Sequence, residues 1–300
     1  MRFRAEIANT AQLTRLITSL APLAKVATLK LKADVVHLIC QGERGGVQVW
    51  SQIAVSSIFK LEGFRLESNN NNEIYLEVTT DALARALRSA AGSTKALIKL
   101  SKKGGHGPGG TGPGAHPVLS IDIESASRMG KRLTITQDVY VKVKKMQDVQ
   151  QLKEPLCPVP DAALLLPPLQ LLRTVAERMK SVSSVITLSA NNAGTFRMRV
   201  EADEAKVETE WPNLKRPNLG DAGDEMTNPV EDPNEFFSVT VETKNLLKFL
   251  ASYSIAQTTI FCLCPNHCAI FYVYVGNSKD NLQGGVLTFF VPAFNVDGDP

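Results

Sequence analysis

The feature that most constrains the fold is an internal repeat. Shifting the sequence by 163 residues without gaps superimposes one amphipathic segment on another, pairing Val78 with Val241, Thr80 with Thr243, Leu83 with Leu246, Arg85 with Lys248 and Leu87 with Leu250. Each half of the chain also shows the same order of elements, with two helical patterns among many short strands. This repetition predicts a duplicated β-rich domain with two helices in each copy.

The periodicity of apolar residues places the elements. Four segments have helical spacing, namely Ala11–Leu20, Asp81–Ala91, Pro168–Lys180 and Thr243–Ser252. Most of the remaining apolar segments are short and several alternate with period two, which is typical of strands in antiparallel sheets. We therefore predict an α+β protein with two duplicated domains, each with two helices packed on antiparallel β-sheet. The domains are residues 1–144 and 161–300, and the proline-bearing segment Lys145–Pro160 is an extended connector.

Composition narrows the class of protein. The 300 residues are 44% hydrophobic and 21% charged, which is typical of a globular chain. We expect no secretion signal and no membrane span, because the first residues have no apolar core and the richest apolar stretch is broken by Pro167 and Pro168. Five cysteines in a long chain favour a reducing compartment, the cytosol or the nucleus. The first 150 residues carry 21 lysines and arginines against 12 acidic residues, and the last 150 carry 12 against 18.

Enzymatic and metal-binding patterns are weak. The best metal candidate is the group Cys262, Cys264, His267 and Cys268, which Cys40 or Cys157 could complete. Small buried cysteines in core strands are the favoured interpretation, so we expect no bound metal and no cofactor. We find no catalytic triad, nucleophile elbow or dinucleotide fingerprint, and expect no enzyme. The Gly-rich segment 104–114 lacks the form of a phosphate-binding loop and is interpreted as a surface insertion whose role is open.

The helices share a basic outer face. In each of them the apolar residues gather on one side, and lysine or arginine lies on the other side or just beyond the helix. These candidate nucleic-acid contacts are Arg15, Lys25, Arg85, Arg88, Arg173, Lys180, Lys244 and Lys248. One such helix is an ordinary solvated surface, but four of four favour a common anionic partner. A handful of phosphate contacts gives only weak, non-specific binding, with a dissociation constant of order 10⁻⁴–10⁻⁶ M, so durable attachment would require enclosure of the duplex.

Several segments, taken together with this architecture, resemble a known family. Two helices per β-rich repeat, an extended connector and basic helix faces resemble the sliding-clamp fold of PCNA. The resemblance is sharper to the Hus branch, a subunit family of the nine-one-one DNA-damage checkpoint clamp. The segments that carry it run from the first residues nearly to the last: Met1–Ile7, Gly45–Trp50, Asn72–Thr79, Leu83–Leu87 and Phe289–Ala293.

The resemblance implies a function. It implies a non-catalytic subunit of a heterotrimeric ring, formed with two Rad-type clamp subunits, that an ATP-driven clamp loader places around double-stranded DNA at damage sites. The four helices would line the ring, and the clamp would recruit checkpoint and repair proteins, with client peptides docking beside the connector. Edge strands would join the subunits, here Val118–Ile123 and Lys206–Trp211. The location would be the nucleus, with some protein in the cytoplasm.

Three alternatives stay open at this stage. The first is a self-trimerising replication clamp of the PCNA type, which differs in the choice of partner subunits. The second is a metal-dependent enzyme that uses the four residues Cys262, Cys264, His267 and Cys268. The third is a basic β-rich scaffold that never contacts DNA. These three are separable by oligomeric state, metal content and the effect of charge reversal at Arg85 and Arg88.

Overall fold

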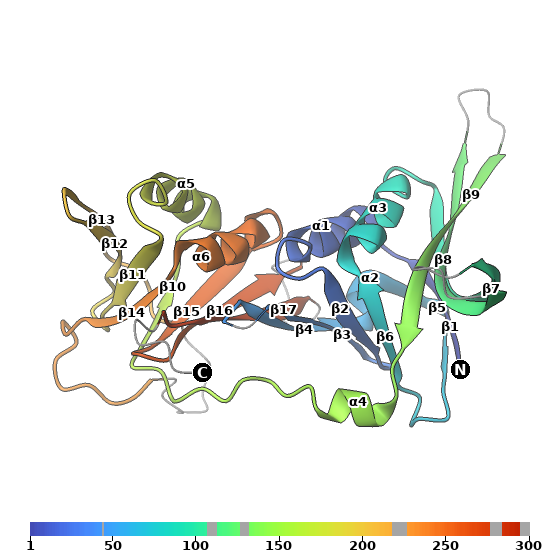
Figure 1. Cartoon of the computed structure of the whole chain (residues 1–300), viewed down its shortest axis with the longest axis horizontal. Coiled ribbons are helices and arrows are strands. Elements are labelled where there is room, and N and C mark those ends of the chain that lie inside the picture. The colour runs from blue at the N-terminus through green and yellow to red at the C-terminus, as the bar shows by residue number, and fades with distance from the viewer. Residues whose placement is uncertain (44, 107–112, 127–131, 218–226, 277–283, 295–300) are drawn as a thin grey trace. The chain divides into compact units, whose positions relative to one another are not determined.

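The computed structural model describes residues 1–43, 45–106, 113–126, 132–217, 227–276 and 284–294. The chain forms two compact units (Figure 1). Among the described residues, the first unit comprises 1–40, 50–153, 276 and 284–285, and the second comprises 41–49, 154–275 and 286–294. The change from the first unit to the second at Lys153 and Glu154 falls within the segment predicted as the connector.

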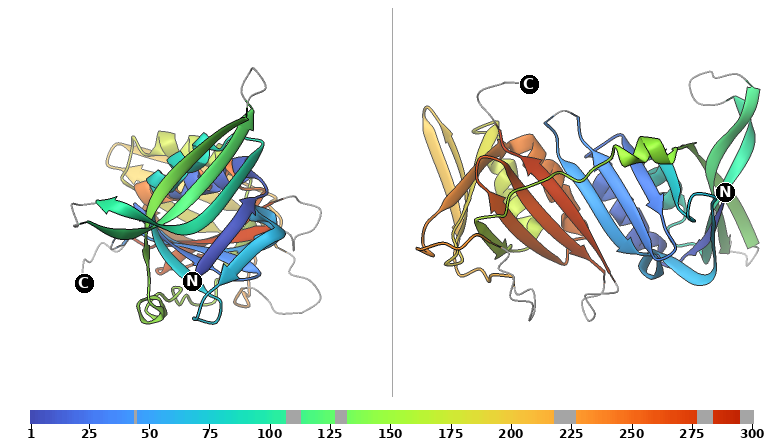
Figure 2. Two further views of the ribbon diagram at one scale, coloured as in Figure 1. Left: turned by 90° about the vertical axis from the view of Figure 1, so that its right-hand side faces the viewer. Right: turned by 90° about the horizontal axis from the view of Figure 1, so that it is seen from below.

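The first unit consists of a sheet and two longer helices. Its elements are β1 (Arg2–Ile7), α1 (Thr10–Leu20), β2 (Val26–Leu31), β3 (Val35–Gln41), most of β4 (Gln48–Ala54), α2 (Val55–Ile58), β5 (Phe59–Glu67), β6 (Ile74–Thr79), α3 (Thr80–Ser89), β7 (Lys95–His106), β8 (Pro113–Ala126), β9 (Arg132–Val143) and α4 (Met146–Gln150). The strand order is β4-β3-β2-β6-β9-β8-β7-β1-β5. β7, β8 and β9 lie side by side (Figure 2, left).

The second unit repeats this plan with two sheets. Its elements are β10 (Ala162–Leu165), α5 (Leu169–Met179), β11 (Val185–Ala190), β12 (Phe196–Ala202), β13 (Ala205–Trp211), β14 (Phe237–Glu242), α6 (Thr243–Leu250), a 3₁₀ turn (Ala251–Ser254), β15 (Thr258–Cys264), β16 (Cys268–Val275) and β17 (Gly285–Pro292). One group of strands runs β10-β15-β16-β17, and the other runs β13-β12-β11-β14.

The duplication is visible in the element boundaries. β6 and α3 begin 163 residues before β14 and α6, and α1 and β2 begin and end 159 residues before α5 and β11. The second helix of each unit is also anchored in the same way. Buried Thr80 donates its backbone N–H to the carbonyl of Lys25 at 3.0 Å, and buried Thr243 donates its own to Ser184 at 2.8 Å. Both copies therefore tie the start of the second helix to the loop that follows the first.

Each helix pair buries its apolar side on the sheet of its own unit. Leu83 and Leu87 of α3 are at most 5% exposed, and α3 packs against α1 and against strands of the first unit. In the second unit, the ring of Phe249 on α6 stacks on Phe271 with 3.9 Å between ring centroids, and meets Phe289 edge-on at 5.2 Å. Offset or edge-on aromatic pairs of this kind add to the free energy gained by burial. In each unit, the apolar side of the helix pair thus covers a sheet.

Some sequence expectations were incomplete. β5 and β10 were not predicted as strands, and β7 and β8 extend into the Gly-rich segment as far as His106 and from Pro113. Residues 107–112 of that segment lie outside the described residues. The predicted extended connector begins with a helical turn, α4, before the chain becomes extended (Figure 2, right). β10 is apolar and only four residues long, so it lacks a period-two signal. β5 does alternate polar with apolar residues, but the alternation changes phase at Gly63, which divides the signal into two short pieces.

Within the described ranges, every helix is too short or too polar to cross a lipid bilayer.

Candidate nucleic-acid interface

The helix pair of the first unit presents arginines to solvent. α1 is capped by Asn9, whose side chain accepts a hydrogen bond from the backbone N–H of Gln12 at 2.9 Å. Leu13 and Ile17 are buried, and Arg15 on the opposite side is exposed. On α3, Arg85 and Arg88 are exposed and lie opposite the buried leucines. A period of 3.6 residues per turn accounts for this separation of charge from apolar surface.

Lys25 joins this surface through the backbone. It lies in the loop between α1 and β2 and is exposed. Its carbonyl accepts the N–H of Thr80, the first residue of α3, and the Thr80 hydroxyl donates to the carbonyl of Ala24 at 2.7 Å. The lysine is therefore held next to the helix that carries Arg85 and Arg88. The sequence had placed it only just beyond the first helix.

The basic residues on and beside α1 and α3 have no ion-pair partner among the described residues. Arg15 and Arg88 direct their Nε atoms to backbone carbonyls one turn back, at 3.4 and 3.3 Å. In the part of the chain that the structure describes, none of the four basic residues Arg15, Lys25, Arg85 and Arg88 forms an ion pair. Asp81 is the one acidic residue on either helix, in the first turn of α3. Unpaired cations on a solvated helix face can bind an anion without first breaking an internal salt bridge.

The helix pair of the second unit is basic but more compensated. On α5, Arg173 pairs with Glu177 at 2.8 Å and lies over the ring of Tyr253 at 5.0 Å. On α6, Lys244 pairs with Glu242 at 3.0 Å and is exposed. An exposed ion pair of this kind is worth little and is easily exchanged for a phosphate. This helix pair therefore offers weaker attraction to an anion than α1 and α3.

Two further predicted residues and one missed residue complete the second surface. Lys180 directly follows α5 and is exposed, and Lys248 on α6 is half-buried. Arg178, which the sequence analysis passed over, is also exposed in the last turn of α5. Its signal was its position on the side of the helix away from Leu172 and Met179. All eight predicted residues thus lie on, or directly beside, the four helices, and their contact with DNA stays a prediction.

The structure corrects one of the two predicted edge strands. Val118–Ile123 lies within β8, which is hydrogen-bonded to β7 on one side and to β9 on the other, so it has no free edge. β9 is the better candidate, because β6 pairs only with its last residues, Val141–Val143. Within the described residues, the other edge of Leu133–Val139 has no strand partner. Lys206–Trp211 does lie at an edge, since β13 ends the sheet order.

The arrangement of elements defines a class of protein. The structure of proliferating cellular nuclear antigen from Entamoeba histolytica matches with a TM-score of 0.69, covering 97% of this chain and 99% of that chain at 12% sequence identity. At that identity the likeness concerns the fold alone. The chain has the sliding-clamp fold, which confirms the predicted fold class.

Sequence comparison identifies the branch. The model of the Hus1-like protein family matches residues 1–295. Checkpoint protein hus1 of Schizosaccharomyces pombe is 32% identical over 298 residues, covering 98% of this chain and 99% of that protein. Checkpoint protein HUS1 of Homo sapiens is 30% identical over 304 residues, covering 98% and 100%. The chain belongs to the Hus1-like family, and the resemblance seen in its sequence is confirmed.

Proposed function

We propose that this chain is a subunit of a checkpoint sliding clamp that encircles double-stranded DNA and recruits checkpoint and repair proteins. The observation that carries the proposal is the set of exposed, unpaired arginines on α1 and α3 in a chain with the sliding-clamp fold. The relatives that match this chain over nearly their full length are checkpoint proteins. Full-length membership of the Hus1-like family favours this function over a self-trimerising replication clamp.

The small number of basic residues bears on how the clamp stays on DNA. Four cations on one helix pair, and partly compensated cations on the other, support only weak electrostatic binding to phosphates, with a dissociation constant of order 10⁻⁴–10⁻⁶ M at physiological salt. Retention on DNA then comes from closure of a ring around the duplex. The basic residues make weak, sequence-independent contacts with the phosphates, which allow the clamp to slide. The chain acts as a scaffold, and the proposal requires no catalytic step or cofactor.

Two free strand edges support contact with two neighbouring subunits. A ring subunit needs two interfaces, and two free strand edges, in β9 and β13, can each add a strand from a neighbour. Apolar side chains are exposed along β9, with Leu133 at 49%, Ile135 at 37% and Tyr140 at 45%. We propose that the neighbours are two Rad-type clamp subunits, that an ATP-driven loader opens the ring, and that the complex acts mainly in the nucleus.

Charge reversal on α3 tests the proposal. In the ring assembled with its partner subunits, we expect Arg85→Glu with Arg88→Glu to reduce retention on closed circular DNA. The logarithmic salt dependence of DNA association should become shallower by about 0.9 for each phosphate that the variant no longer neutralises. Equilibrium binding over a series of salt concentrations measures both effects.

A matched control distinguishes the effect of the α3 positions from the effect of the change in net charge. Arg2→Glu with Arg4→Glu makes the same change of charge at two exposed positions on β1, on the face of the strand opposite the buried Phe3 and Ala5. This control should retain the salt dependence of the unmodified ring. If the α3 variant assembles normally and binds DNA like the control, the chain is a scaffold that does not contact DNA, and the proposal is wrong.

A further inference from the structure

Three possible metal ligands meet where the connector passes the β15–β16 hairpin. The Sγ atoms of Cys157 and Cys268 are 3.4 Å apart, and Nδ1 of His267 is 3.2 Å from Sγ of Cys268. The three ligand atoms all lie within 4.8 Å of one another. The sequence analysis had grouped Cys262 and Cys264 with the His-Cys pair, but both are core residues, at most 1% exposed. The Cys264 thiol contacts that of Cys268, yet neither Cys262 nor Cys264 belongs to the group whose ligand atoms all lie within 4.8 Å of one another.

The backbone holds His267 in place without help from a ligand. Cys264 and Cys268 are opposite each other at the end of the hairpin, and Asn266 takes a left-handed conformation in the turn between them, with φ of 56°. The N–H of His267 donates to the carbonyl of Cys264 at 3.1 Å, and the carbonyl of His267 accepts the N–H of Ala293 at 3.0 Å. Two ligands therefore come from a rigid turn, and the third comes from the connector.

The separations suit a tetrahedral ion. With Zn–S bonds of about 2.3 Å and Zn–N bonds of about 2.0 Å, ligand atoms in a tetrahedral site lie roughly 3.5–3.8 Å apart. The two distances to Sγ of Cys268, 3.4 and 3.2 Å, require only small outward shifts. The third pair, Sγ of Cys157 and Nδ1 of His267, lies within 4.8 Å, and side-chain rotation has to bring it to the tetrahedral separation. Thiolate and imidazole are also the ligands that zinc prefers, whereas magnesium and calcium select oxygen.

Space for the remaining coordination position adjoins the cluster. Cys157, His267 and Cys268 line a cavity of about 100 Å³, together with Gln48, Pro155 and other residues of the second unit. A water molecule occupies about 30 Å³ in the liquid, so the cavity has room for one beside the ion. His267 is exposed and Cys157 half-buried, which gives an ion a route to the site. Packing of buried cysteines alone does not account for an exposed imidazole directed at a sulfur atom.

We propose that Cys157, His267 and Cys268 bind one zinc ion, with water as the fourth ligand, and that the ion clips the connector to the β15–β16 hairpin. The connector has little apolar anchoring of its own at this point, since Leu156 is 95% and Val159 is 56% exposed. Binding replaces the thiol protons of Cys157 and Cys268 with bonds to the metal, and both protons leave to solvent. The ion is a structural tie, and no reaction is assigned to it.

Cobalt substitution tests the site directly. The full-length protein, reduced and freed of metal, is titrated with Co²⁺ and followed by absorption. We expect a single equivalent to produce thiolate-to-cobalt charge-transfer absorption and the visible bands of a tetrahedral ion, and zinc to abolish both. Cys157→Ser and His267→Gln should each remove the thiolate-linked signal or weaken Co²⁺ binding strongly. Both residues are partly or fully exposed, so these variants should fold, as circular dichroism would verify.

Two further variants make the test specific. Cys40→Ser changes a buried cysteine of the first unit and should leave the Co²⁺ spectrum unchanged. Cys264→Ser should keep the tetrahedral bands and the thiolate-linked absorption, because the proposal assigns the fourth position to water, whereas their loss would make the neighbouring Cys264 a ligand and overturn that assignment. The proposal fails if reduced protein gives no thiolate-to-cobalt absorption, if Cys157→Ser retains it in full, or if Cys40→Ser loses it. Isolation of the protein with a Cys157–Cys268 disulfide and no metal affinity after reduction would likewise overturn it.

Discussion

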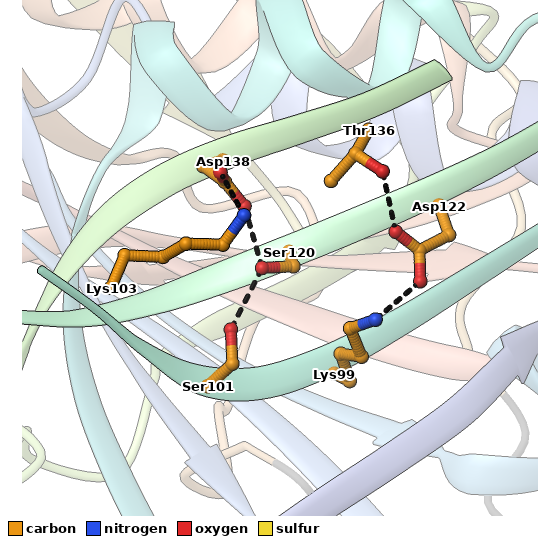
Figure 3. Close-up of polar contacts among 7 residues, drawn as sticks. All are labelled: Lys99, Ser101, Lys103, Ser120, Asp122, Thr136 and Asp138. Atoms are coloured by element: carbon orange, nitrogen blue, oxygen red, sulfur yellow. Dashed lines mark hydrogen bonds and ion pairs between the residues drawn. The ribbon is translucent and has the colours of Figure 1, made fainter. Parts of the chain in front are cut away.

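Asp138 shows how single residues of the first unit cooperate across strands. Its carboxylate accepts a hydrogen bond from the Ser120 hydroxyl at 2.5 Å and pairs with Lys103 at 3.0 Å, and Ser120 in turn contacts Ser101 at 2.8 Å (Figure 3). Lys99, Asp122 and Thr136 form a second set beside it (Figure 3). Ser120 is fully buried, so its hydroxyl needs these partners. The polar network therefore fixes the alignment of β7, β8 and β9 on the face away from α3.

This network predicts a pH dependence of stability. Burial alone would raise the pKa of Asp138, but hydrogen bonds from Ser120 and Lys103 and the charge of Lys103 hold it below the ordinary 3.8. A carboxyl group with a lowered pKa in the folded state stabilises the protein fully above 3.8, and this contribution is lost as the pH falls through the folded-state pKa. We expect Asp138→Asn to flatten the decline in the urea midpoint below pH 4.

The control for this prediction is the removal of another carboxylate. Asp203→Asn removes an exposed acid from the turn between β12 and β13, outside the network, and should leave the acid dependence as in the unmodified protein. An equal flattening in both variants, or none in Asp138→Asn, would show that the network does not govern acid stability. The comparison uses differences in midpoint, since Asp138 is partly exposed and solvent screens its interactions.

At the scale of elements, the position of the free sheet edge in the first unit differs from its prediction: it lies in β9 and not in β8. The sequence shows β9 as one alternating strand, and it does pair with β8 along Arg132–Tyr140. On its other side β6 reaches only the last three residues, so the rest of that edge is free within the described residues. The pairing of β6 with β9 joins residues 63 or more positions apart in the chain, such as Val78 and Val141, and no local pattern encodes it. Alternation within β8 and β9 therefore could not show that, of these two strands, β9 is the one with a free edge among the described residues.

The β9 edge predicts a site of subunit contact. Leu133→Glu with Ile135→Glu should weaken association with one clamp partner by at least about tenfold, because a carboxylate desolvated against a neighbouring strand costs more than about 1.4 kcal/mol. Leu61→Glu is the matched control, since Leu61 is 65% exposed on β5 at the end of the sheet. Sedimentation of co-expressed subunits measures association. Normal assembly of the β9 variant, or equal weakening in the β5 variant, would place the interface elsewhere.

At the scale of the whole molecule, the two units share one plan but differ in charge. Their helices begin at equivalent positions, and Thr80 and Thr243 make equivalent backbone hydrogen bonds. Yet the cations on α1 and α3 have no acidic partner among the described residues, whereas Arg173 and Lys244 in the second unit do. Duplication therefore preserved the scaffold and let the surfaces diverge.

The family assignment predicts how the chain assembles. Alone, the 32.6 kDa chain should not form a stable ring of three copies. Co-expressed with two clamp-like partner chains, it should enter a complex with one copy of each, because the proposed ring puts a different neighbour at each of its two edges. Light scattering of the purified species measures the mass. A stable species of three times the chain mass from this protein alone would restore the replication-clamp alternative.

The sequence by itself determined the features that depend on local spacing. Helical periodicity placed the four main helices within a few residues of their observed ends and put Arg15, Arg85 and Lys244 on their outer sides, because burial of leucines and exposure of charge follow the 3.6-residue turn. The repeat followed from the same signal. Only the tertiary structure decided which strand edge stays free and which side chains meet across long separations. Cys157 and Cys268 are 111 residues apart in the chain, and they come together because the folded backbone carries the connector past a hairpin turn.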